Sequence, residues 1–404
     1  MHVRGLATAL SIGAAVFMSA CGGGGGDPAP TGSGMLRAAL VDAPACGYEH
    51  VYVTVERLRV HRSAGASEGE SGWSEIALAA PRRVDLLTLR NGVVMELGQT
   101  ELPAGTYQQL RLVLAESGTQ PLAHAVVPTG GSEVALDTPS GSQTGLKAQV
   151  GITVAAGQTA DVLVDFDACK SVVPRGQSGR YTLKPVIRVL PRIQAAGARV
   201  VGHVDTRMAG ATVSVQSAGV SVASTVPDPM TGRFELFPVP DGSYTLVIAG
   251  GSRATGVVTG VPVRADLPTQ LNLPTSPILL PEGAPRGLMA SVIAAPSLLP
   301  ATASLRLVQT LTGGPPIDVL GVPLEPNAGA RHVQVASASP WVAPFVAGAA
   351  APVFAVDSGT GVTGRYRAEA TLTPAGAAAL VKSQDVDVSA ALPDPLPDLA
   401  FAFP

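Results

Sequence analysis

The sequence predicts an all-β protein built from tandem β-sandwich modules behind an N-terminal export signal and a flexible tether. Three observations carry this prediction. Short runs such as 109–114 and 161–166 alternate between apolar and polar residues and are rich in β-branched side chains. Turn-forming pairs such as Asn91-Gly92 recur along the chain. Long stretches with helical periodicity are nearly absent, and only short helical turns are expected, near 86–97 and 374–381.

The composition narrows the class of protein. Of 404 residues, 46% are hydrophobic and only 14% are charged, which excludes a disordered polyelectrolyte. The formal net charge of -3 offers no electrostatic basis for binding nucleic acid. Because aromatic residues make up only 4% of the chain, the cores are expected to consist of Val, Leu and Ala.

Residues 1–20 read as a signal peptide. Arg4 supplies the positive start, and the apolar stretch that follows is too short to span a bilayer. The stretch ends in Met18-Ser19-Ala20-Cys21, which resembles the bacterial lipobox. The resemblance implies that Cys21 receives a diacylglycerol and becomes the first residue of the mature chain. The alternative is a plain secretory peptide with an incidental cysteine.

Residues 21–34 are rich in glycine and proline and are expected to form a tether. Gly22, and not an aspartate, follows Cys21. By resemblance to lipoprotein sorting in Gram-negative bacteria, this favours the outer membrane. Whether the anchored chain faces the periplasm or the outside stays open.

Three modules are expected after the tether. Clusters of proline and small residues at 191–198 and 274–277 mark the breaks. The expected ranges are therefore 35–192, 198–275 and 278–404.

Four of the 6 tyrosines follow a glycine by two positions, and we expect them to be structural. In the frame of a tyrosine corner, glycine takes the positive φ and the ring enters the space between the sheets, with its hydroxyl against backbone. Stacking on a sugar ring is the alternative role. The four are Tyr107, Tyr181, Tyr244 and Tyr366.

The first module contains several characteristic runs, which include 41–44, 52–56, 102–107 and 183–187. Through these runs it resembles the bacterial family known as domain of unknown function 4382. The resemblance implies a periplasmic or surface β-domain, usually lipid-anchored, and no activity.

The second module resembles carboxypeptidase-regulatory-like domains of the prealbumin and Cna-B sandwich type, through 201–204, 232–236 and 239–246. The third module resembles the same type more loosely, through 303–308 and 364–368. Such domains are often classed with carbohydrate-associated folds, which is an analogy of fold.

Cys46 and Cys169 remain once Cys21 is lipidated. Two cysteines of one module in an oxidising compartment predict a disulfide that ties the ends of the first module together. Two buried thiols are the alternative.

The sequence contains few patterns typical of a catalytic or metal-binding site. The 6 histidines show no metal-ligand spacing, so no metal site and no cofactor are expected. Asp165 and Asp167 are expected to point to one side of a strand, where a calcium site is weighed against solvated carboxylates or ion pairs with Arg111 and Arg188. No nucleophile elbow is present in the sequence.

Trp73 and Trp341 lie near loops and are the candidate carbohydrate contacts. The alternative role for both side chains is to pack over the end of a β-sandwich and cover its core.

The sequence favours a lipid-anchored cell-envelope protein that acts as a non-enzymatic scaffold or adhesion-type binding module. The first alternative is a carbohydrate-binding accessory lipoprotein, and the second is an envelope enzyme with a dispersed site. The expected partners are the membrane, through the lipid anchor, and an unknown envelope protein or glycan, with no nucleic acid.

Overall fold

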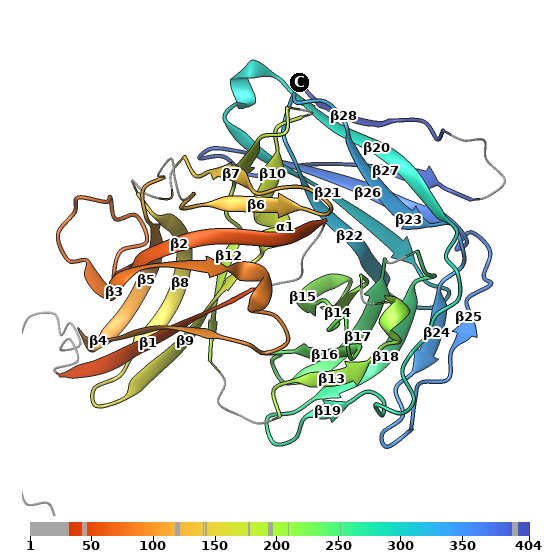
Figure 1. Ribbon diagram of the computed structural model, residues 1–404, viewed down its shortest axis with the longest axis horizontal. Helices are drawn as coiled ribbons and strands as arrows, with labels where there is room; N and C mark the ends of the chain where they lie inside the picture. The colour runs from red at the N-terminus through yellow and green to blue at the C-terminus, as the bar shows by residue number, and fades with distance from the viewer. Residues whose placement is uncertain are drawn as a thin grey trace, which may run out of the picture.

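The computed structural model describes residues 32–42, 47–117, 122–139, 141, 144–176, 178–192, 197–208, 210–250, 252–389 and 395–404. Nearly all regular structure in these residues is β-strand, arranged in six sheets (Figure 1). The prediction of an all-β protein is confirmed. Among the described residues, no helix has the length and apolar character needed to cross a membrane.

The first module pairs a four-stranded sheet, in the order β12-β9-β1-β4, with an eight-stranded sheet, in the order β10-β11-β7-β6-β2-β5-β8 with β3 beside β2. Its main core lies between the two sheets and consists chiefly of Leu and Val. The strands are β1 (Ser33–Asp42), β2 (Tyr48–His61), β3 (Ser74–Asp85), β4 (Met95–Pro103), β5 (Gly105–Leu114), β6 (Ala125–Pro128), β7 (Val134–Asp137), β8 (Leu146–Val154), β9 (Thr159–Phe166), β10 (Val172–Pro174), β11 (Tyr181–Leu183) and β12 (Ile187–Pro191).

β1 begins inside the range expected for the tether. Ser33 and Gly34 already pair with Pro103 and Leu102 of β4. Gly34 lies so close to Ala155 that a Cβ at position 34 would stand 2.2 Å from its carbonyl oxygen. Glycine is therefore required by packing at this position, where composition alone suggested a linker.

The middle module pairs a three-stranded sheet, in the order β16-β13-β19, with a six-stranded sheet, in the order β15-β14-β17-β18-β24-β25. Its strands are β13 (Val200–His203), β14 (Thr212–Ser217), β15 (Val220–Thr225), β16 (Arg233–Leu236), β17 (Gly242–Ala249), β18 (Gly256–Val263), β19 (Thr269–Gln270), β24 (Trp341–Pro344) and β25 (Ala355–Val356).

The third module pairs a three-stranded sheet, in the order β23-β20-β28, with a four-stranded sheet, in the order β22-β21-β26-β27. Its strands are β20 (Pro285–Ala294), β21 (Ala301–Thr310), β22 (Pro316–Leu324), β23 (Arg331–Ala336), β26 (Arg365–Pro374), β27 (Leu380–Asp387) and β28 (Leu399–Phe403).

The strand order corrects the expected boundary at 278. β24 lies within the expected third module, yet it pairs in parallel with β18 of the middle module. Ile278 and Leu280 also belong to the middle core. The chain thus leaves the middle module, builds part of the third, returns for β24 and β25, and leaves again. Such a pairing between distant strands has no local sequence signal.

Three of the four expected structural tyrosines are buried. The Tyr107 hydroxyl donates to the carbonyl oxygen of Pro103 at 3.0 Å, and that of Tyr244 donates to Pro240 at 2.8 Å. Both bonds join a tyrosine to the residue four positions before it, as in a tyrosine corner. Tyr366 is buried in the third core, whereas Tyr181 is half-buried against Tyr48.

Helical structure is confined to short turns. The 3-10 helix η1 (Leu86–Thr88) falls where a helical turn was expected. The range 374–381 contains a turn followed by the start of β27, so no helix forms there. The unexpected α1 (Ala168–Ser171) is capped by the Asp167 carboxylate, which accepts from the Lys170 amide. The other 3-10 helices are η2 (Thr206–Met208) and η3 (Pro296–Leu298).

Candidate functional site

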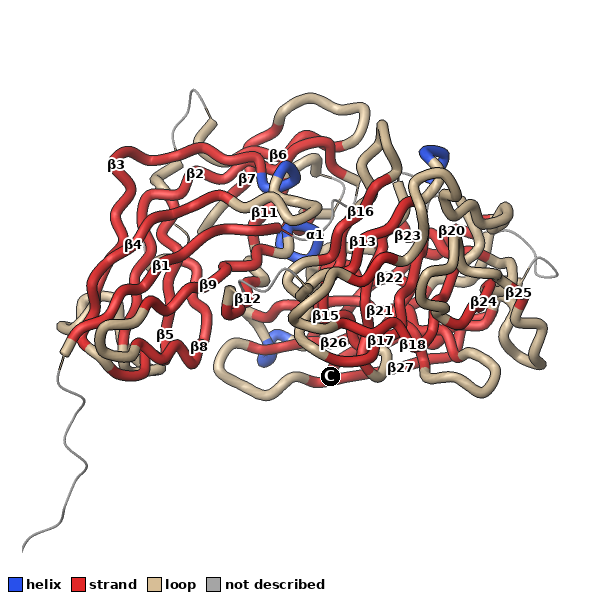
Figure 2. Tube along the Cα trace, turned by 90° about the horizontal axis from the view of Figure 1, so that it is seen from below, coloured by secondary structure: helices blue, strands red, loops and turns tan. Residues whose placement is uncertain are grey.

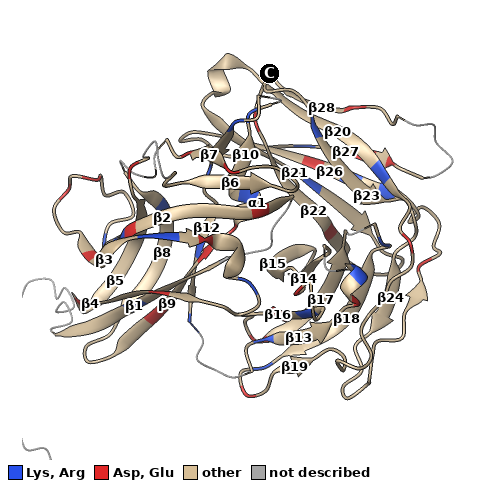
Figure 3. Cartoon of the chain, in the orientation of Figure 1, with Lys and Arg blue, Asp and Glu red and all other residues tan. Residues whose placement is uncertain are grey.

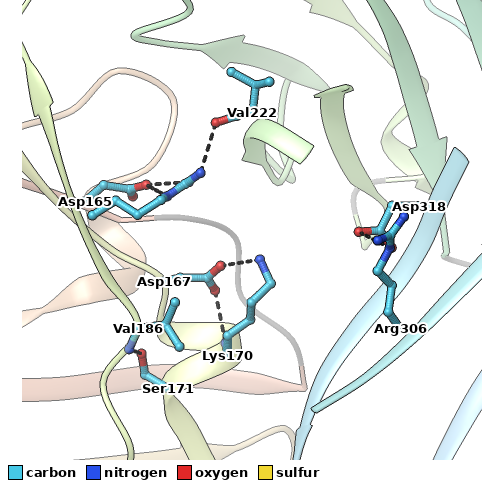
Figure 4. A network of polar contacts seen from close by, with 9 residues as sticks. Asp165, Asp167, Lys170, Ser171, Val186, Val222, Arg306 and Asp318 are labelled. Carbon is cyan, nitrogen blue, oxygen red and sulfur yellow. Dashed lines mark hydrogen bonds and ion pairs between the residues drawn. The ribbon is translucent and has the colours of Figure 1, made fainter. Parts of the chain in front are cut away.

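The three modules meet around α1 (Figure 2), and polar side chains of all three lie at this junction (Figure 4). The first module contributes β9, α1 and β12, the middle module contributes β14 and β15, and the third contributes β21 and β22. Because charged side chains are costly to bury without partners, the contacts at this junction determine how firmly the modules are held together.

Arg188 joins the first module to the middle one. Its guanidinium forms an ion pair with Asp165 at 2.6 Å and donates to the carbonyl oxygen of Val222 at 3.2 Å. Burial raises the pKa of the Asp165 carboxyl, and the charge of Arg188 lowers it. The guanidinium therefore partly compensates a carboxylate that burial disfavours.

Asn91 provides a second connection between these modules. Its amide donates to the carbonyl oxygen of Val226 at 3.2 Å, and its oxygen accepts from the Thr225 hydroxyl and the Glu235 amide at 3.0 and 3.1 Å. Asn91 has a φ of 56° in the turn that the sequence predicted at Asn91-Gly92. The turn thus aims a side chain into the neighbouring module.

Gln216 and Asp318 join the middle module to the third. The Gln216 amide donates to the backbone oxygen of Asp318 at 2.7 Å, and the Asp318 backbone amide donates back at 2.8 Å. The Asp318 carboxylate faces Arg306 at 3.5 Å. Burial nevertheless raises its pKa to about 6, with Arg306 and Lys170 opposing the shift and Glu369 adding to it.

Lys184 joins the first module to the third. Its ammonium forms an ion pair with Glu325 at 2.7 Å and donates to the carbonyl oxygen of Ala301 at 3.3 Å. All three pairs of modules are therefore connected by side-chain hydrogen bonds or ion pairs. The relative placement of the modules is built into the fold.

A groove of about 690 Å³ lies between the first and third modules, and we refer to it as the inter-module groove. One wall is the segment from Thr182 to Val186, together with Thr138 and Leu146 of the first module. The other wall is the outer face of β21 and β26. The Lys184 ammonium, on the first wall, donates to the carbonyl oxygen of Ala301, on the second.

Hydroxyl groups line the third-module wall of this groove in a regular array. Thr302 pairs with Thr373 across β21 and β26, and Ser304 pairs with Thr371 in the same register. Residues two apart on a strand share a face, so the four hydroxyls form two adjacent rows. Thr182 lies on the opposite wall, but it is buried and its hydroxyl accepts from the Arg175 guanidinium. The array can exchange hydrogen bonds with a neutral polar ligand.

The structure describes only Cys169 of the expected disulfide, because Cys46 lies outside the described residues. Cys21, the expected lipidation site, also lies outside them. Cys169 is buried in α1. The chain segments beside the two cysteines nonetheless lie close together. Asp42 and Phe166 are partners at the ends of the parallel strands β1 and β9, and the Tyr48 hydroxyl donates to Val172 at 3.5 Å.

Trp73 is half-buried and engaged by protein groups. The guanidinium carbons of Arg59 and Arg111 lie 4.8 and 4.9 Å from its ring centroid, and the His61 ring lies 5.0 Å away. The indole donates to the carbonyl oxygen of Ser67 at 2.9 Å. These contacts favour its role as a plug over that of an open stacking platform.

Trp341 is also half-buried. It begins β24, pairs with Gly256 of β18, and packs with Phe345 and Phe354 against the middle core. Neither tryptophan lines the inter-module groove. The structure therefore does not bring the two candidate carbohydrate contacts together.

The aspartates considered for calcium are engaged by cations. Asp165 pairs with Arg188, and Asp167 pairs with Lys170 at 2.7 Å. Arg111 instead donates to the backbone oxygens of Thr144 and Ala66, both at 2.8 Å. Across the part of the chain that the structure describes, no group of three or more His, Cys, Asp or Glu side chains is placed to hold a metal ion.

Sequence reasoning did not identify Asn91, Gln216, Asp318 or the inter-module groove as parts of a site. The Asn91-Gly92 turn was visible, but the module that its side chain contacts is encoded far away in the sequence. The groove was not visible, because its walls come from segments more than 100 residues apart.

One family model matches the first module. The family described as domain of unknown function (DUF4382) matches residues 33–185. This match supports the resemblance seen in the sequence, and the family's description names no activity. No curated protein matches the chain.

Solved structures add no argument on fold or function. A leucine-rich repeat protein from Bacteroides thetaiotaomicron is 15% identical with a TM-score of 0.17, and the match covers 62% of this chain and 27% of that one. A Ca²⁺-stabilised adhesin of an Antarctic bacterium that binds ice is 11% identical with a TM-score of 0.12, over 93% and 75% of the two chains. The pilus adhesin SpaC from Lactobacillus rhamnosus GG is 7% identical with a TM-score of 0.13, over 92% and 42%.

Proposed function

We propose that this protein is a lipid-anchored protein of the bacterial outer membrane that acts as a non-enzymatic binding module, with the inter-module groove as its ligand-binding surface. The lipobox-like end of the signal peptide at Cys21 supports the anchor. The anchored modules face the periplasm or the cell surface.

One observation carries the proposed binding role: side-chain hydrogen bonds and ion pairs between the modules fix the two walls of the groove relative to each other. Lys184, on one wall, donates to the carbonyl oxygen of Ala301, on the other. Gln216 and Asn91 connect each of the two wall modules to the middle one. A preorganised groove binds without the entropic cost of ordering its walls, which is the general advantage of a rigid binding site.

Photo-crosslinking in living cells tests the binding role. A benzophenone amino acid at position 302, inside the groove, is expected to form a crosslinked adduct with an envelope component. The same amino acid at Met230, an exposed residue of the middle module, is the control. Equal adducts at both positions, or none at 302 and at a second groove position, 373, would count against the groove.

Metabolic labelling tests the anchor. Cells fed an alkyne fatty acid are expected to label the full-length protein, and Cys21→Ala is expected to abolish the label. Recovery of unlabelled wild-type protein in the soluble fraction would refute the anchor. Protease treatment of intact cells then distinguishes a surface location from a periplasmic one.

A glycan is the second candidate, as occupant of the same groove. The two hydroxyl rows on β21 and β26 favour it, since hydroxyls can both donate and accept hydrogen bonds to a sugar. Ser304→Trp would fill the groove and is expected to abolish binding to any glycan that the wild-type chain retains on an array. Silence of the wild-type chain across the array would argue against a glycan while leaving a protein ligand.

A further inference from the structure

A hollow of about 400 Å³ lies between the first and middle modules, apart from the inter-module groove, and we refer to it as the arginine hollow. Its volume falls within the range typical of small-molecule sites. Among the described residues, its charged lining consists of Arg37 of β1, Glu96 of β4, Arg192 directly after β12 and Arg199 directly before β13. Figure 3 shows blue Lys and Arg positions beside β13 and on β16, where the middle module begins.

Two of the guanidiniums are oriented by carboxylates of the first module. Asp161 accepts from both Nε and Nη2 of Arg37, and Glu96 accepts from Nη1 of Arg192 at 2.6 Å. The Arg192 backbone amide donates to the carbonyl oxygen of Asp161 at 2.9 Å, which places the two arginines beside each other. A guanidinium carries five N–H groups, so each arginine keeps donors beyond those that its carboxylate engages.

Arg199 comes from the middle module and shares its carboxylate with another arginine. Glu235 accepts from Arg199 at 2.7 Å and also from Arg233. The whole cluster therefore holds four arginines and three carboxylates, which leaves one positive charge in excess. The Nε of Arg199 is buried and has no hydrogen-bond partner among the described residues. Its guanidinium carbon lies 4.7 Å from the ring centroid of Phe237, which also lines the hollow.

The walls of the arginine hollow are fixed relative to each other. Val94 and Phe237 line it and pack in the small apolar cluster that joins the two modules. Gly92 also lines it, directly after Asn91, whose side chain bonds to the middle module. Donors that are held in place bind a ligand without the entropic cost of ordering them. The three lining arginine side chains are 22–37% exposed, so an anion between them is partly shielded from water and more strongly attracted.

We propose that the arginine hollow binds a phosphate group. Guanidiniums match phosphate oxygens through parallel N–H···O bonds. Three guanidiniums that line one hollow from three chain segments suit an anion with at least three acceptor oxygens, whereas a carboxylate offers two. Free phosphate and the phosphomonoesters of larger molecules share this chemistry, and the test separates them. The inference depends neither on the lipid anchor nor on the inter-module groove.

Isothermal titration calorimetry tests the site on the unacylated chain from Gly22 to Pro404, which retains every described residue. Inorganic phosphate and glycerol 3-phosphate are the probes, and acetate at equal ionic strength is the control anion. Both phosphate probes are expected to bind more tightly than acetate. Tighter binding of glycerol 3-phosphate would assign the hollow to a phosphomonoester, and equal or tighter binding of inorganic phosphate would assign it to the free ion.

Two substitutions are expected to change phosphate affinity in opposite directions. Arg192→Gln is expected to weaken binding about tenfold, because a charge-assisted hydrogen bond is lost. Glu96→Gln removes the carboxylate that lines the hollow and is expected to tighten binding about threefold. Arg365→Gln removes an arginine of the third module that pairs with Asp387 at 2.9 Å. It is the matched control and should bind as the wild type does.

The Glu96 side chain is 51% exposed, so its variant is expected to fold, and a thermal melt of every variant checks this. Arg199→Lys keeps the charge but loses the planar fork of donors, and it is expected to weaken binding as well. The inference would be overturned by acetate binding as tightly as the phosphate probes, or by no binding of either phosphate probe. Equal affinity of wild type, Arg192→Gln and Glu96→Gln would also overturn it, because binding would then take place elsewhere on the chain.

Discussion

Asn91 illustrates how one residue links two modules. Its left-handed φ of 56° is a conformation that asparagine and glycine adopt more readily than other residues. Its side chain makes the three hydrogen bonds to the middle module described above. Backbone conformation and inter-module bonding therefore depend on the same amino acid.

Asn91→Gly separates these two contributions. Glycine keeps the backbone conformation, so the loss of the three side-chain bonds is expected to lower the free energy of unfolding by about 1 to 3 kcal/mol. Denaturant titration measures the change. Ser252→Gly, at an exposed position with a φ of 63°, is the control and should stay within about 0.5 kcal/mol of wild type. An equal loss of stability in both variants would show that the change of backbone flexibility, and not the loss of the side-chain bonds, lowers the free energy of unfolding.

Asp318 predicts a pH dependence of stability. Its carboxyl has a pKa of about 6 in the folded protein, against an ordinary value of 3.8, and its buried Oδ1 lacks a hydrogen-bond partner among the described residues. The folded state therefore binds a proton more tightly than the unfolded state does. This carboxyl lowers stability above pH 6, and the penalty fades as the pH falls toward 4.

Asp318→Asn is accordingly expected to be more stable than wild type by about 1 to 3 kcal/mol at pH 8. The difference should shrink toward pH 4. Chemical unfolding at several pH values tests this, with Asp385→Asn, whose side chain is 81% exposed, as the control without such a dependence. A variant that is less stable than wild type at pH 8 would show that the contacts of the carboxylate with Arg306 and Lys170 outweigh its burial.

At the scale of elements, β1 and β9 explain why a disulfide between positions 46 and 169 suits this fold. These strands are parallel neighbours whose ends, Asp42 and Phe166, lie side by side. Each cysteine follows its strand by a few residues. The sequence predicted this pairing because the first module has two cysteines and is expected in an oxidising compartment. The parallel pairing of β1 with β9 brings together the chain segments that precede the two cysteines.

Reduction is therefore expected to lower the free energy of unfolding by about 4 to 5 kcal/mol, since the bond would close a very long loop. Thiol labelling of the native, oxidised protein should find neither Cys46 nor Cys169 reactive. Cys46→Ser should reproduce the effect of reduction. Labelling of both thiols without a reductant would refute the bond.

Local features of the fold could be predicted from the sequence, whereas features that depend on distant partners could not. Period-two alternation and turn pairs are properties of neighbouring residues, and they predicted the strands. The hydroxyl bonds of Tyr107 and Tyr244 were predicted because glycine, tyrosine and acceptor lie within a few residues of each other. The positive φ expected at the preceding glycine is present at Gly105 and not at Gly242. β24 was assigned to the wrong module because its partner β18 lies about 80 residues earlier. The inter-module groove depends on packing between modules and has no local signal.

At the scale of the whole molecule, the middle and third modules are interdependent because the chain crosses between them repeatedly. Without β24, the edge of β18 would present unpaired backbone groups. The middle core would also lose its contacts with Trp341, Phe345 and Phe354. A cut after the expected boundary at 275 therefore removes structural parts of the middle sandwich.

A fragment of residues 198–284 is accordingly expected to melt at a lower temperature than the same fragment joined through a Gly-Ser linker to residues 339–357. The added segment restores the pairing of β24 with β18 and the burial of three aromatic side chains. The first fragment is also expected to associate through its free β18 edge, which light scattering detects. Thermal melts followed by circular dichroism compare the melting temperatures of the two fragments. Equal melting temperatures would mean that the middle sandwich is complete without β24 and β25, and that these two strands only rest against it.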